Sequence, residues 1–456
     1  MRFFAFIIAL LALLPTYGQQ RLSLSEAANL AIENNPAIKA TDHALRAAQR
    51  QRQAAIGLYL PQIAVNSGWI RTQKDIGFDL NPLKPLFSEL NIAPLLGLDW
   101  SYTLQPRSFG FIEADITIPI FTGGKIVAAN RAAKASERAA YSQNIARTDK
   151  VVTELITRYF GSVLAANSVK VRELLLRSIE QHLSDIIALT DAGMATKADK
   201  LYVEFALEDA RQQLSAARSQ FAIAQRALST TIGTATAIQT TSDIFIVTTI
   251  EELDHFKSAA LTNNSQLRYI TEQRELAKQN VNLKRADFFP EIVAMGGGGF
   301  TRNITELLPR WAIGIGLSFK LFNGTTREYN YLAAKDIYRQ AEEISISAEQ
   351  NITLLVEQLY SQTITHLNRV IALNSSISFA EQYLENKRVA FAQSMASSAD
   401  VIDATLLVAK SHIEQLEAAY NFDISLAQLL ETAGESYRFF DYSESKNRQI
   451  IEYEVR

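Results

Sequence analysis

Alternation of large apolar residues with small or polar ones predicts β-strands in two parts of the chain. Across 311–321, Trp, Ile, Leu and Phe alternate with Ala, Gly, Ser and Lys. Across 112–120, isoleucines alternate with acidic residues and threonine, and 63–69 carries the same pattern. A two-residue period over roughly ten residues is typical of strands that cross a membrane in a barrel. A soluble β-sandwich is the alternative, but its second sheet would have to cover faces this apolar.

Long helices are predicted on either side of these strands. Residues 125–190 contain no Pro and one Gly, and 327–391 is a counterpart in the second half of the chain. At 1.5 Å per residue, each would form a rod of roughly 100 Å. A shorter helix returns after each one. In the first return helix, a three-and-four spacing of Leu, Ala and Phe predicts a coiled-coil seam: Leu207, Ala210, Leu214, Ala217, Phe221, Ala224 and Leu228.

The chain repeats itself. Four motifs recur in the same order: 34–38 with 263–267, 60–63 with 289–292, 120–124 with 321–325, and 192–199 with 393–400. Only the segment between the second and third motifs differs in length, by about 28 residues, which indicates a loop-bearing hairpin. Because 71–108 holds the extra residues and four prolines, it is predicted to be a long external loop.

These boundaries predict five segments. Residues 1–18 resemble a signal peptide, because a basic start precedes an apolar run that is too short to span a membrane. Repeat 1 covers 19–235, with a hairpin at 62–120 and a tip near 193; repeat 2 covers 263–435, with a hairpin at 291–321 and a tip near 394. An equatorial linker, 236–262, joins the repeats, and 436–456 forms a C-terminal equatorial segment.

Four strands cannot close a barrel, and an open sheet edge in lipid leaves backbone groups unpaired. The predicted fold is therefore an α+β membrane protein: a long α-helical coiled-coil tube with a transmembrane β-barrel shared by three chains. Each chain would contribute four strands and two internal repeats.

Composition removes other function classes. The chain has no cysteine, which excludes disulfides, thiolate metal sites and a Cys nucleophile. Its net charge of −3 gives no reason to expect nucleic acid as a partner. The five histidines lie far apart, without zinc-type spacing. We therefore predict no enzyme activity, no catalytic residue, no metal site and no cofactor.

In order and spacing, several motifs together resemble the TolC-type outer-membrane efflux protein family: 22–27, 34–36, 121–124, 192–194 and 400–405. The resemblance implies a homotrimer in the outer membrane of a Gram-negative cell, with a tube that extends into the periplasm. A collar of mixed structure would involve 20–33, 234–262 and 436–456. The implied function is an exit duct for small molecules or polypeptides, in tripartite efflux or type I secretion. The implied partners are a periplasmic adaptor, an inner-membrane transporter and outer-membrane lipid.

A secreted coiled-coil scaffold or adhesin without a pore is the alternative function. It accounts for the helices and the signal peptide, but it does not account for two patterned hairpins placed symmetrically between the helices.

Near the two tips, Thr196 with Asp199 and Ser397 with Asp400 fit a capping box. Asp400 and Asp403 are three residues apart on a helix, and the resemblance places them at the tunnel end. There, threefold symmetry would make carboxylate rings that attract cations and raise one another's pKa. These two residues are the predicted gate. At the positions of the family's Tyr and Arg lock this chain has Phe391 and Ala396, so its locking contacts must differ.

Two further groups of site residues are predicted. The adaptor would contact the periplasmic tip at Ala192, Gly193, Met194, Thr196, Ser394, Met395 and Ser397. Lipid would contact the barrel at Ile116, Ile118, Trp311, Ile313, Ile315, Leu317 and Phe319.

Overall fold

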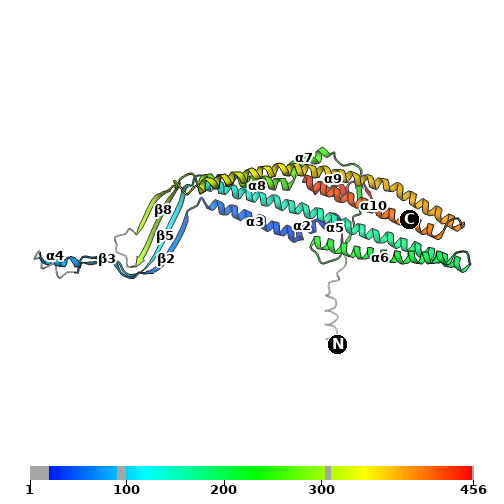
Figure 1. Cartoon of the computed structure of the whole chain (residues 1–456), viewed down its shortest axis with the longest axis horizontal. Coiled ribbons are helices and arrows are strands. Elements are labelled where there is room, and N and C mark those ends of the chain that lie inside the picture. The colour runs from blue at the N-terminus through cyan, green and yellow to red at the C-terminus, as the bar shows by residue number, and fades with distance from the viewer. Residues whose placement is uncertain (1–19, 90–98, 303–309, 454–456) are drawn as a thin grey trace, which may run out of the picture. The chain divides into compact units, whose positions relative to one another are not determined.

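The computed structural model describes residues 20–89, 99–302 and 310–453. The signal peptide predicted at 1–18 lies outside the described residues. The helices are α2 Leu24–Asn34, α3 Pro36–Gly57, α4 Lys84–Glu89, α5 Lys125–Asp191, α6 Lys197–Ile232, α7 Leu253–Asn263, α8 Ser265–Ala286, α9 Thr326–Ala392, α10 Ser398–Ala433 and α11 Arg438–Glu444, with a 3-10 turn η1 at Asn81–Leu83 (Figure 1).

The strands are short in one group and long in the other. The short ones are β1 Gln20–Leu22, β3 Ile76–Asp79, β4 Ser101–Gln105, β6 Ile238–Thr240, β7 Phe245–Val247 and β10 Arg448–Ile450. The long ones are β2 Gln62–Arg71, β5 Ser108–Phe121, β8 Glu291–Arg302 and β9 Trp311–Ser318.

Corresponding helices of the two halves have equal lengths. Helices α5 and α9 have 67 residues each, α6 and α10 have 36, and α3 and α8 have 22. The two long helices begin and end within about one residue of the predicted bounds, because Gly124 and Thr325 precede them with positive φ angles of 88° and 65° and so end the preceding turns.

The seam predicted on α6 is only partly buried. Five of its seven residues are buried, but Phe221 and Ala224 are partly exposed. Four of the five buried residues lie within 207–217, where Leu207 and Ala210 pack in a core with Ile179 and Ile186 of α5. The fifth, Leu228, is buried near the end of the helix in the other core.

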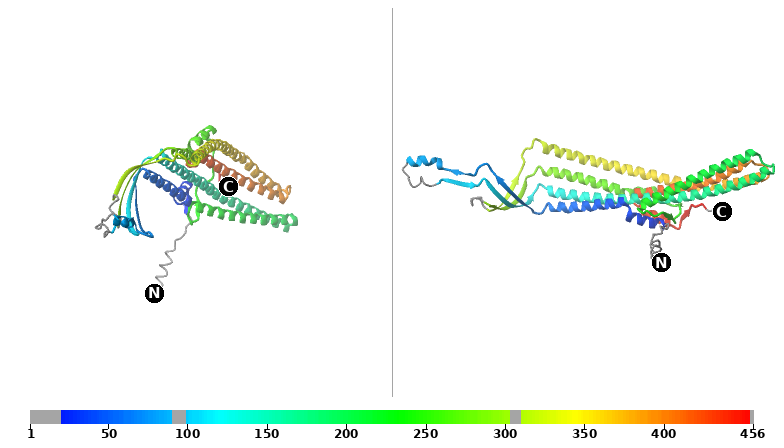
Figure 2. Two further views of the ribbon diagram at one scale, coloured as in Figure 1. Left: turned by 60° about the vertical axis from the view of Figure 1, so that its left-hand side comes forward. Right: turned by 90° about the horizontal axis from the view of Figure 1, so that it is seen from below.

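The four long strands form one antiparallel sheet in the order β2-β5-β8-β9. The central pair, β5 and β8, comes from different halves of the chain. Next to the sheet, α3, α5, α8 and α9 lie in one layer in the same order (Figure 2). The sheet is thus built from two hairpins side by side, and β2 and β9 are its edge strands.

The register places the alternating isoleucines on one face. Ile63 is opposite Ile116, which is opposite Gly296, which is opposite Ile313. Because directly opposed residues point to the same side of a sheet, this row shares a face, and the predicted alternation is confirmed in register. Asn66 and Glu113, also opposed, are on the other face.

The prediction of strand structure up to residue 321 is wrong. Strand β9 ends at Ser318, which is opposite Glu291, the first residue of β8. No described neighbouring strand continues beside Phe319, so its backbone has no partner for inter-strand hydrogen bonds. Phe319 is exposed but lies outside β9, whereas the other predicted lipid-facing residues lie within β5 or β9.

The prediction of a long loop at 71–108 also needs correction. Strands β3 and β4 form an antiparallel pair within this segment, and η1 and α4 follow β3. Pro82 is accommodated because it stands at the start of η1, where a missing N–H costs no hydrogen bond.

The chain divides into two compact units. One comprises 47–137 and 272–342 and contains the four-stranded sheet with the adjoining helix ends. The other comprises 1–46, 138–271 and 343–456. Its core is built around Phe160, which meets the rings of Phe245 and Phe439 at centroid distances of 6.0 and 6.1 Å.

Segments far apart in sequence meet in this second unit. Strand β1 pairs with β6 in parallel, and β7 pairs with β10 in antiparallel fashion. The Tyr159 hydroxyl, on α5, donates to the Leu22 carbonyl at 2.8 Å and accepts from the Thr241 amide at 2.9 Å. The three segments predicted as a collar therefore lie together around α5 and α10.

Within the described part of the chain, no helix is both long enough and apolar enough to cross a membrane.

Candidate functional site

The two turns between long and return helices have the same backbone geometry. After α5, Gly193 has φ 75°, and the Met194 amide donates to the Leu189 carbonyl at 2.8 Å. After α9, Ser394 has φ 60°, and the Met395 amide donates to the Ala390 carbonyl at 2.8 Å. A left-handed residue in this place closes a helix by satisfying its last carbonyls. Ser394 bears the strain that glycine avoids at the first turn.

Both return helices begin with the predicted capping box. Asp199 and Asp400 each donate their backbone N–H to the hydroxyl of the cap residue, Thr196 or Ser397, at 3.1 and 3.2 Å. Their carboxylates accept from the backbone N–H of the same cap residues at 3.1 and 2.9 Å. Asp199 and Asp400 therefore help to cap the N-termini of the two return helices, α6 and α10.

Asp400 differs from Asp199 in having a cation beside it. Lys387 Nζ on α9 lies 2.9 Å from Asp400 Oδ1. This hydrogen bond and those from Ser397 hold the pKa of Asp400 far below its usual range. Within one chain, therefore, a lysine stabilises the charge of Asp400 and lowers its pKa, whereas the predicted rise depends on like charges from other copies.

Asp403 makes a different contact. The Tyr202 hydroxyl on α6 donates to Asp403 Oδ1 at 3.2 Å. Burial, and then the charge of Asp403, raise the pKa of Tyr202, which stays a neutral donor. The two predicted gate residues thus contact different helices. Asp400 binds Lys387 within the helical hairpin formed by α9 and α10, whereas Asp403 joins the two return helices, α6 and α10.

A buried histidine near the turns was not predicted as part of the site. His182 on α5 is 8% exposed; its Nε2 is 2.8 Å from Ser398 Oγ, and its ring meets Phe391 at 5.2 Å. Arg388 on α9 also donates to Ser178 Oγ on α5, at 3.0 Å. Burial lowers the pKa of His182. These contacts join the helical hairpin α5–α6 to the helical hairpin α9–α10. The contacting residues are far apart in sequence, which explains why no local pattern revealed them.

The predicted adaptor-contact residues lie on the surface of the turns. Met194 and Met395 are 73% and 77% exposed. Exposed methionines are uncommon, and their flexible side chains suit a surface that adapts to a partner. All seven predicted residues are exposed: Ala192, Gly193, Met194, Thr196, Ser394, Met395 and Ser397.

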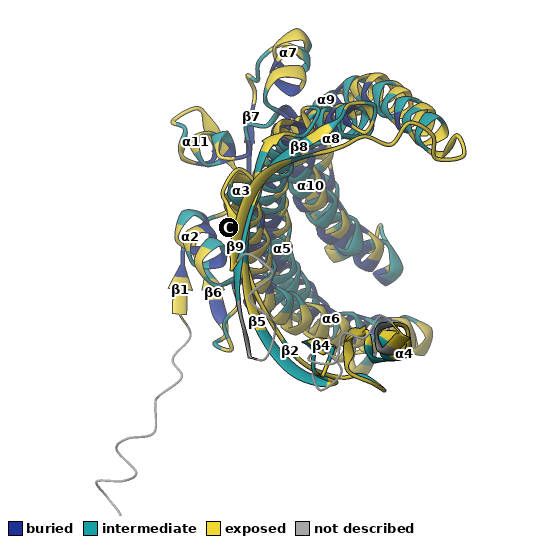
Figure 3. Cartoon of the chain, turned by 90° about the vertical axis from the view of Figure 1, so that its left-hand side faces the viewer, coloured by how far each residue is buried: buried dark blue, intermediate teal, exposed yellow. Residues whose placement is uncertain are grey.

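The apolar face of the four-stranded sheet is uncovered within one chain (Figure 3). Ile313 and Ile315 are 79% and 74% exposed. The other predicted lipid-facing residues in the strands, Ile116, Ile118, Trp311 and Leu317, are exposed too. The opposite face carries Asp115, whose carboxylate accepts from Asn66 at 3.0 Å. One face is thus apolar and exposed, and the other carries the polar side chains Asn66, Glu113 and Asp115.

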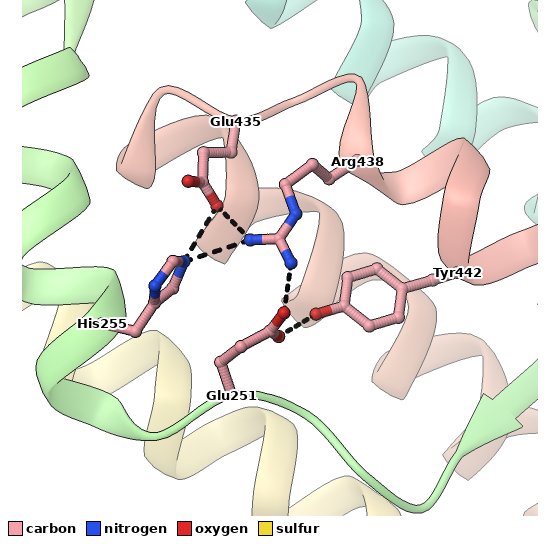
Figure 4. A network of polar contacts seen from close by, with 5 residues as sticks. All are labelled: Glu251, His255, Glu435, Arg438 and Tyr442. Carbon is pink, nitrogen blue, oxygen red and sulfur yellow. Dashed lines mark hydrogen bonds and ion pairs between the residues drawn. The ribbon is translucent and has the colours of Figure 1, made fainter.

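A second polar network that the sequence did not predict joins the start of α7 to α11 and to the turn between α10 and α11 (Figure 4). Arg438 contacts the carboxylates of Glu435, at 2.6 Å, and Glu251. Tyr442 donates to Glu251, and His255 Nε2 lies 3.3 Å from Glu435. The network ties the 234–262 segment to 436–456. Among the described residues, no group of three or more His, Asp or Glu side chains could hold a metal ion.

Comparisons with known proteins identify relatives of this chain. The outer membrane efflux protein family matches residues 27–234 and 257–435. The alkaline protease secretion protein AprF of Pseudomonas aeruginosa is 21% identical over 303 residues, which cover 63% of this chain and 62% of AprF. The chain thus aligns with less than two thirds of that relative.

Solved structures share the fold. The Campylobacter jejuni CmeC outer membrane channel superimposes with a TM-score of 0.75 at 15% identity, over 93% of this chain and 89% of CmeC. A membrane protein from Pseudomonas aeruginosa gives a TM-score of 0.77 at 17% identity, over 90% of each chain.

Proposed function

Because the chain belongs to the outer membrane efflux protein family, we propose that it is an exit duct that carries cargo across the outer membrane. Three copies form the duct. Members of this family are transport proteins, and we assign the chain no catalytic step.

The observation that carries the proposal is the sheet. It has four strands, one aliphatic face with no cover, and two unpaired edges, β2 and β9. In hydrocarbon, every unpaired backbone group costs several kcal/mol. Three copies joined β9 to β2 would pair all edges in a closed barrel, with the aliphatic faces towards lipid and the faces bearing Glu113 and Asp115 towards the lumen.

The helices supply the periplasmic part. Each copy contributes two 67-residue helices, and a helix of that length reaches roughly 100 Å. Three copies of two similar halves would give a tube with quasi-sixfold symmetry. The network around Arg438 and Glu251 would stiffen the collar outside this tube.

At the end of the tube, the two turns would receive a periplasmic adaptor. We assign the contact to the exposed turn residues, with Met194 and Met395 as the apolar anchors. The adaptor would connect the duct to an inner-membrane transporter. Since both turns share one geometry, one adaptor type could bind either, at six places around the trimer.

The gate is assigned chiefly to Asp403. Its carboxylate is exposed and Tyr202 holds it in place, so three copies would present a ring of charge at the tunnel entrance. Asp400 contributes less negative potential because Lys387 compensates it. Tyr202 and His182 replace the family's Tyr and Arg as contacts between the hairpins.

Both kinds of cargo, small molecules and polypeptides, fit a duct of this kind. AprF is by name a protease secretion protein and CmeC an outer membrane channel. We extend the polypeptide possibility to this chain on the strength of AprF alone.

A pore-free scaffold is the competing function, and oligomeric state in detergent separates the two. Protein extracted from outer membranes should be trimeric by size exclusion with light scattering, and its migration on gels should change on heating. A monodisperse monomer with intact strand content would contradict the proposal.

A further inference from the structure

A buried histidine holds the two helical hairpins of the chain together near their turns. The Nε2 atom of His182, on α5, lies 2.8 Å from Oγ of Ser398, the first residue of α10. The His182 ring also meets the ring of Phe391, on α9, edge to face at 5.2 Å. One side chain of the hairpin α5–α6 therefore touches both helices of the hairpin α9–α10. We call these three residues, His182, Phe391 and Ser398, the tip latch.

The internal repeat does not require a histidine in this place. Tyr383 of α9 stands as far before the turn at Ser394 as His182 stands before the turn at Gly193. The histidine thus occurs in one half of the chain, although the helices around it occur in both. An apolar side chain could fill the core here at no electrostatic cost, whereas a buried imidazole becomes costly as soon as it is charged.

The surroundings of His182 disfavour its charged form. The residue is 8% exposed, and this burial lowers its pKa. The carboxylate of Asp185, one turn further along α5, acts against this effect, as does the contact with Ser398. The guanidinium of Arg388, on α9, adds to the lowering. The residues that α6 contributes to the same core carry no charge: Val203, Ala206 and Leu207.

Arg388 is itself fixed beside the latch. It donates to Ser178 Oγ, on α5, at 3.0 Å, so it links the same two hairpins as His182 does. A proton on His182 would therefore put an imidazolium out of water and near a guanidinium, with the carboxylate of Asp185 as the compensating charge. Separation of the hairpins would relieve this cost, because the imidazolium would regain its contact with water.

We propose that the tip latch is a pH-sensitive contact, which holds the two helical hairpins together while His182 is neutral and releases them when His182 takes up a proton. Release lets α9 and α10 move away from α5 and widens the periplasmic end of the duct. This inference rests on the proposed function, and it adds regulation by pH to the gate that Tyr202 and Asp403 form.

The direction of the effect follows from the two states of the tip. Because the closed tip binds a proton at His182 less readily than the open tip, a falling pH favours the open tip. A freely exposed histidine has a pKa of about 6.5, so at pH 5.5 about ten side chains are charged for each neutral one. One latch can therefore shift the balance towards open tips by up to about tenfold between pH 7.5 and pH 5.5.

Conductance at these two pH values tests the latch. Trimers of the full-length protein are inserted in planar bilayers, and the solution on the periplasmic side is changed from pH 7.5 to pH 5.5. We expect the natural protein to open several-fold more often at pH 5.5. His182→Gln should lose this response, because the Gln amide can bond Ser398 but takes up no proton. His43→Gln is the matched control, since it replaces an exposed histidine on α3, and it should keep the response.

A second variant tests the electrostatic cause. Arg388→Gln removes the guanidinium while an amide can still donate to Ser178. A charged His182 is then better tolerated in the closed tip, so the response to pH should shrink. Asp400 and Asp403 are present in both variants, so any pH dependence that comes from these carboxylates remains in them.

Hydrogen exchange locates the change within the chain. Amide exchange in 394–402, measured by mass spectrometry and corrected for the intrinsic effect of pH, should speed up at pH 5.5 in the natural protein but not in His182→Gln. Asp149, whose pKa burial raises to about 6, is present in both proteins. Its titration therefore cannot produce a difference between them.

The possible outcomes separate the latch from the duct. Natural trimers that conduct equally at both pH values would overturn the latch and leave the duct intact, and so would His182→Gln trimers that respond like the natural protein. If His182→Gln does not assemble, a full response in Arg388→Gln would overturn the latch. Absence of trimers, or of current at both pH values, would instead refute the proposed function.

Discussion

Tyr202 and Asp403, joined by a 3.2 Å hydrogen bond, occupy the same position in the two halves of the chain. Each is the sixth residue of its return helix. The internal repeat thus brings equivalent positions face to face, and divergence has made one a donor and the other an acceptor. A contact between equivalent residues is a natural place to control how far the two hairpins separate.

Loss of this contact should loosen the tip. We expect Tyr202→Phe to raise conductance in planar bilayers, because the hydroxyl that joins α6 to α10 is removed. One hydrogen bond contributes about 0.5–1.5 kcal/mol, so trimer assembly should persist. Tyr141→Phe, at an exposed tyrosine on α5, is the control. Unchanged conductance in Tyr202→Phe would show that this bond does not restrain the tip.

The two carboxylates near the tip should differ in cation block. Divalent cations added to the periplasmic side should block the natural channel, and Asp403→Asn should remove most of that block. Asp400→Asn should have a weaker effect on block, because Lys387 already compensates its charge. Single-channel recordings measure both. A larger loss of block in Asp400→Asn than in Asp403→Asn would reverse our assignment.

The lowered pKa of Asp400 predicts how its contribution to stability depends on pH. Its pKa is lower in the folded state than in the unfolded chain, through the contacts with Lys387 and Ser397. The stabilisation is therefore complete above the unfolded pKa of about 4 and is lost only as pH falls below that value. Asp400→Asn should lower the thermal unfolding midpoint equally at pH 6 and pH 8. A penalty that grows between these two values would contradict this origin.

Asp149 should show the opposite pH dependence. It is 7% exposed, and burial raises its pKa to about 6, with a further contribution from the negative charge of Glu431. Since the folded pKa exceeds the unfolded one, the ionised form destabilises the fold, and this cost appears as pH rises from about 4 to beyond 6. Asp149→Asn should therefore stabilise the protein at pH 8, by about 1–3 kcal/mol, and change little at pH 4.

Thermal unfolding at the two pH values measures this effect. Asp336→Asn is the control, because the Asp336 side chain is 72% exposed. Equal effects of Asp149→Asn at both pH values would show that ionisation of Asp149 is not the cause.

The aliphatic face of the sheet should tolerate charge poorly. Ile315→Arg should cost about 2–4 kcal/mol near the bilayer midplane and reduce the yield of trimers in membranes. Gly314→Ser is the matched control on the opposite face, since a Cβ there meets nothing within 4 Å. Gly316 suits less well, because its Cβ would lie 2.4 Å from Met295 Cε. Equal yields for Ile315→Arg and Gly314→Ser would show that the faces are misassigned.

Local patterns made much of the fold predictable. The bounds of α5 and α9 follow from missing helix breakers and from Gly124 and Thr325 before them. The faces of β5 and β9 follow from alternation, which depends only on the geometry of a strand. The two capping boxes were readable because cap and acidic residue are three positions apart.

Contacts between distant segments could not be predicted in the same way. The contact between Lys387 and Asp400 is an exception, because the two residues lie on either side of the turn at Ser394 and a helical hairpin folded there brings them together. Nothing local pairs His182 with Ser398, or Tyr202 with Asp403, because these pairs are more than 200 residues apart. Phe319 was misplaced because alternation continues beyond Ser318, whereas strand length depends on the partner strand. The β3–β4 pair was missed because its strands are short.

Conductance of the purified protein tests the central claim most directly. Detergent-solubilised trimers are added to one side of a planar lipid bilayer, and current is recorded under an applied voltage. A duct formed by three copies predicts discrete, uniform current steps, and these should disappear when the preparation consists of Ile315→Arg protein that does not assemble. Well-folded natural trimers that enter the bilayer without carrying current would contradict the account.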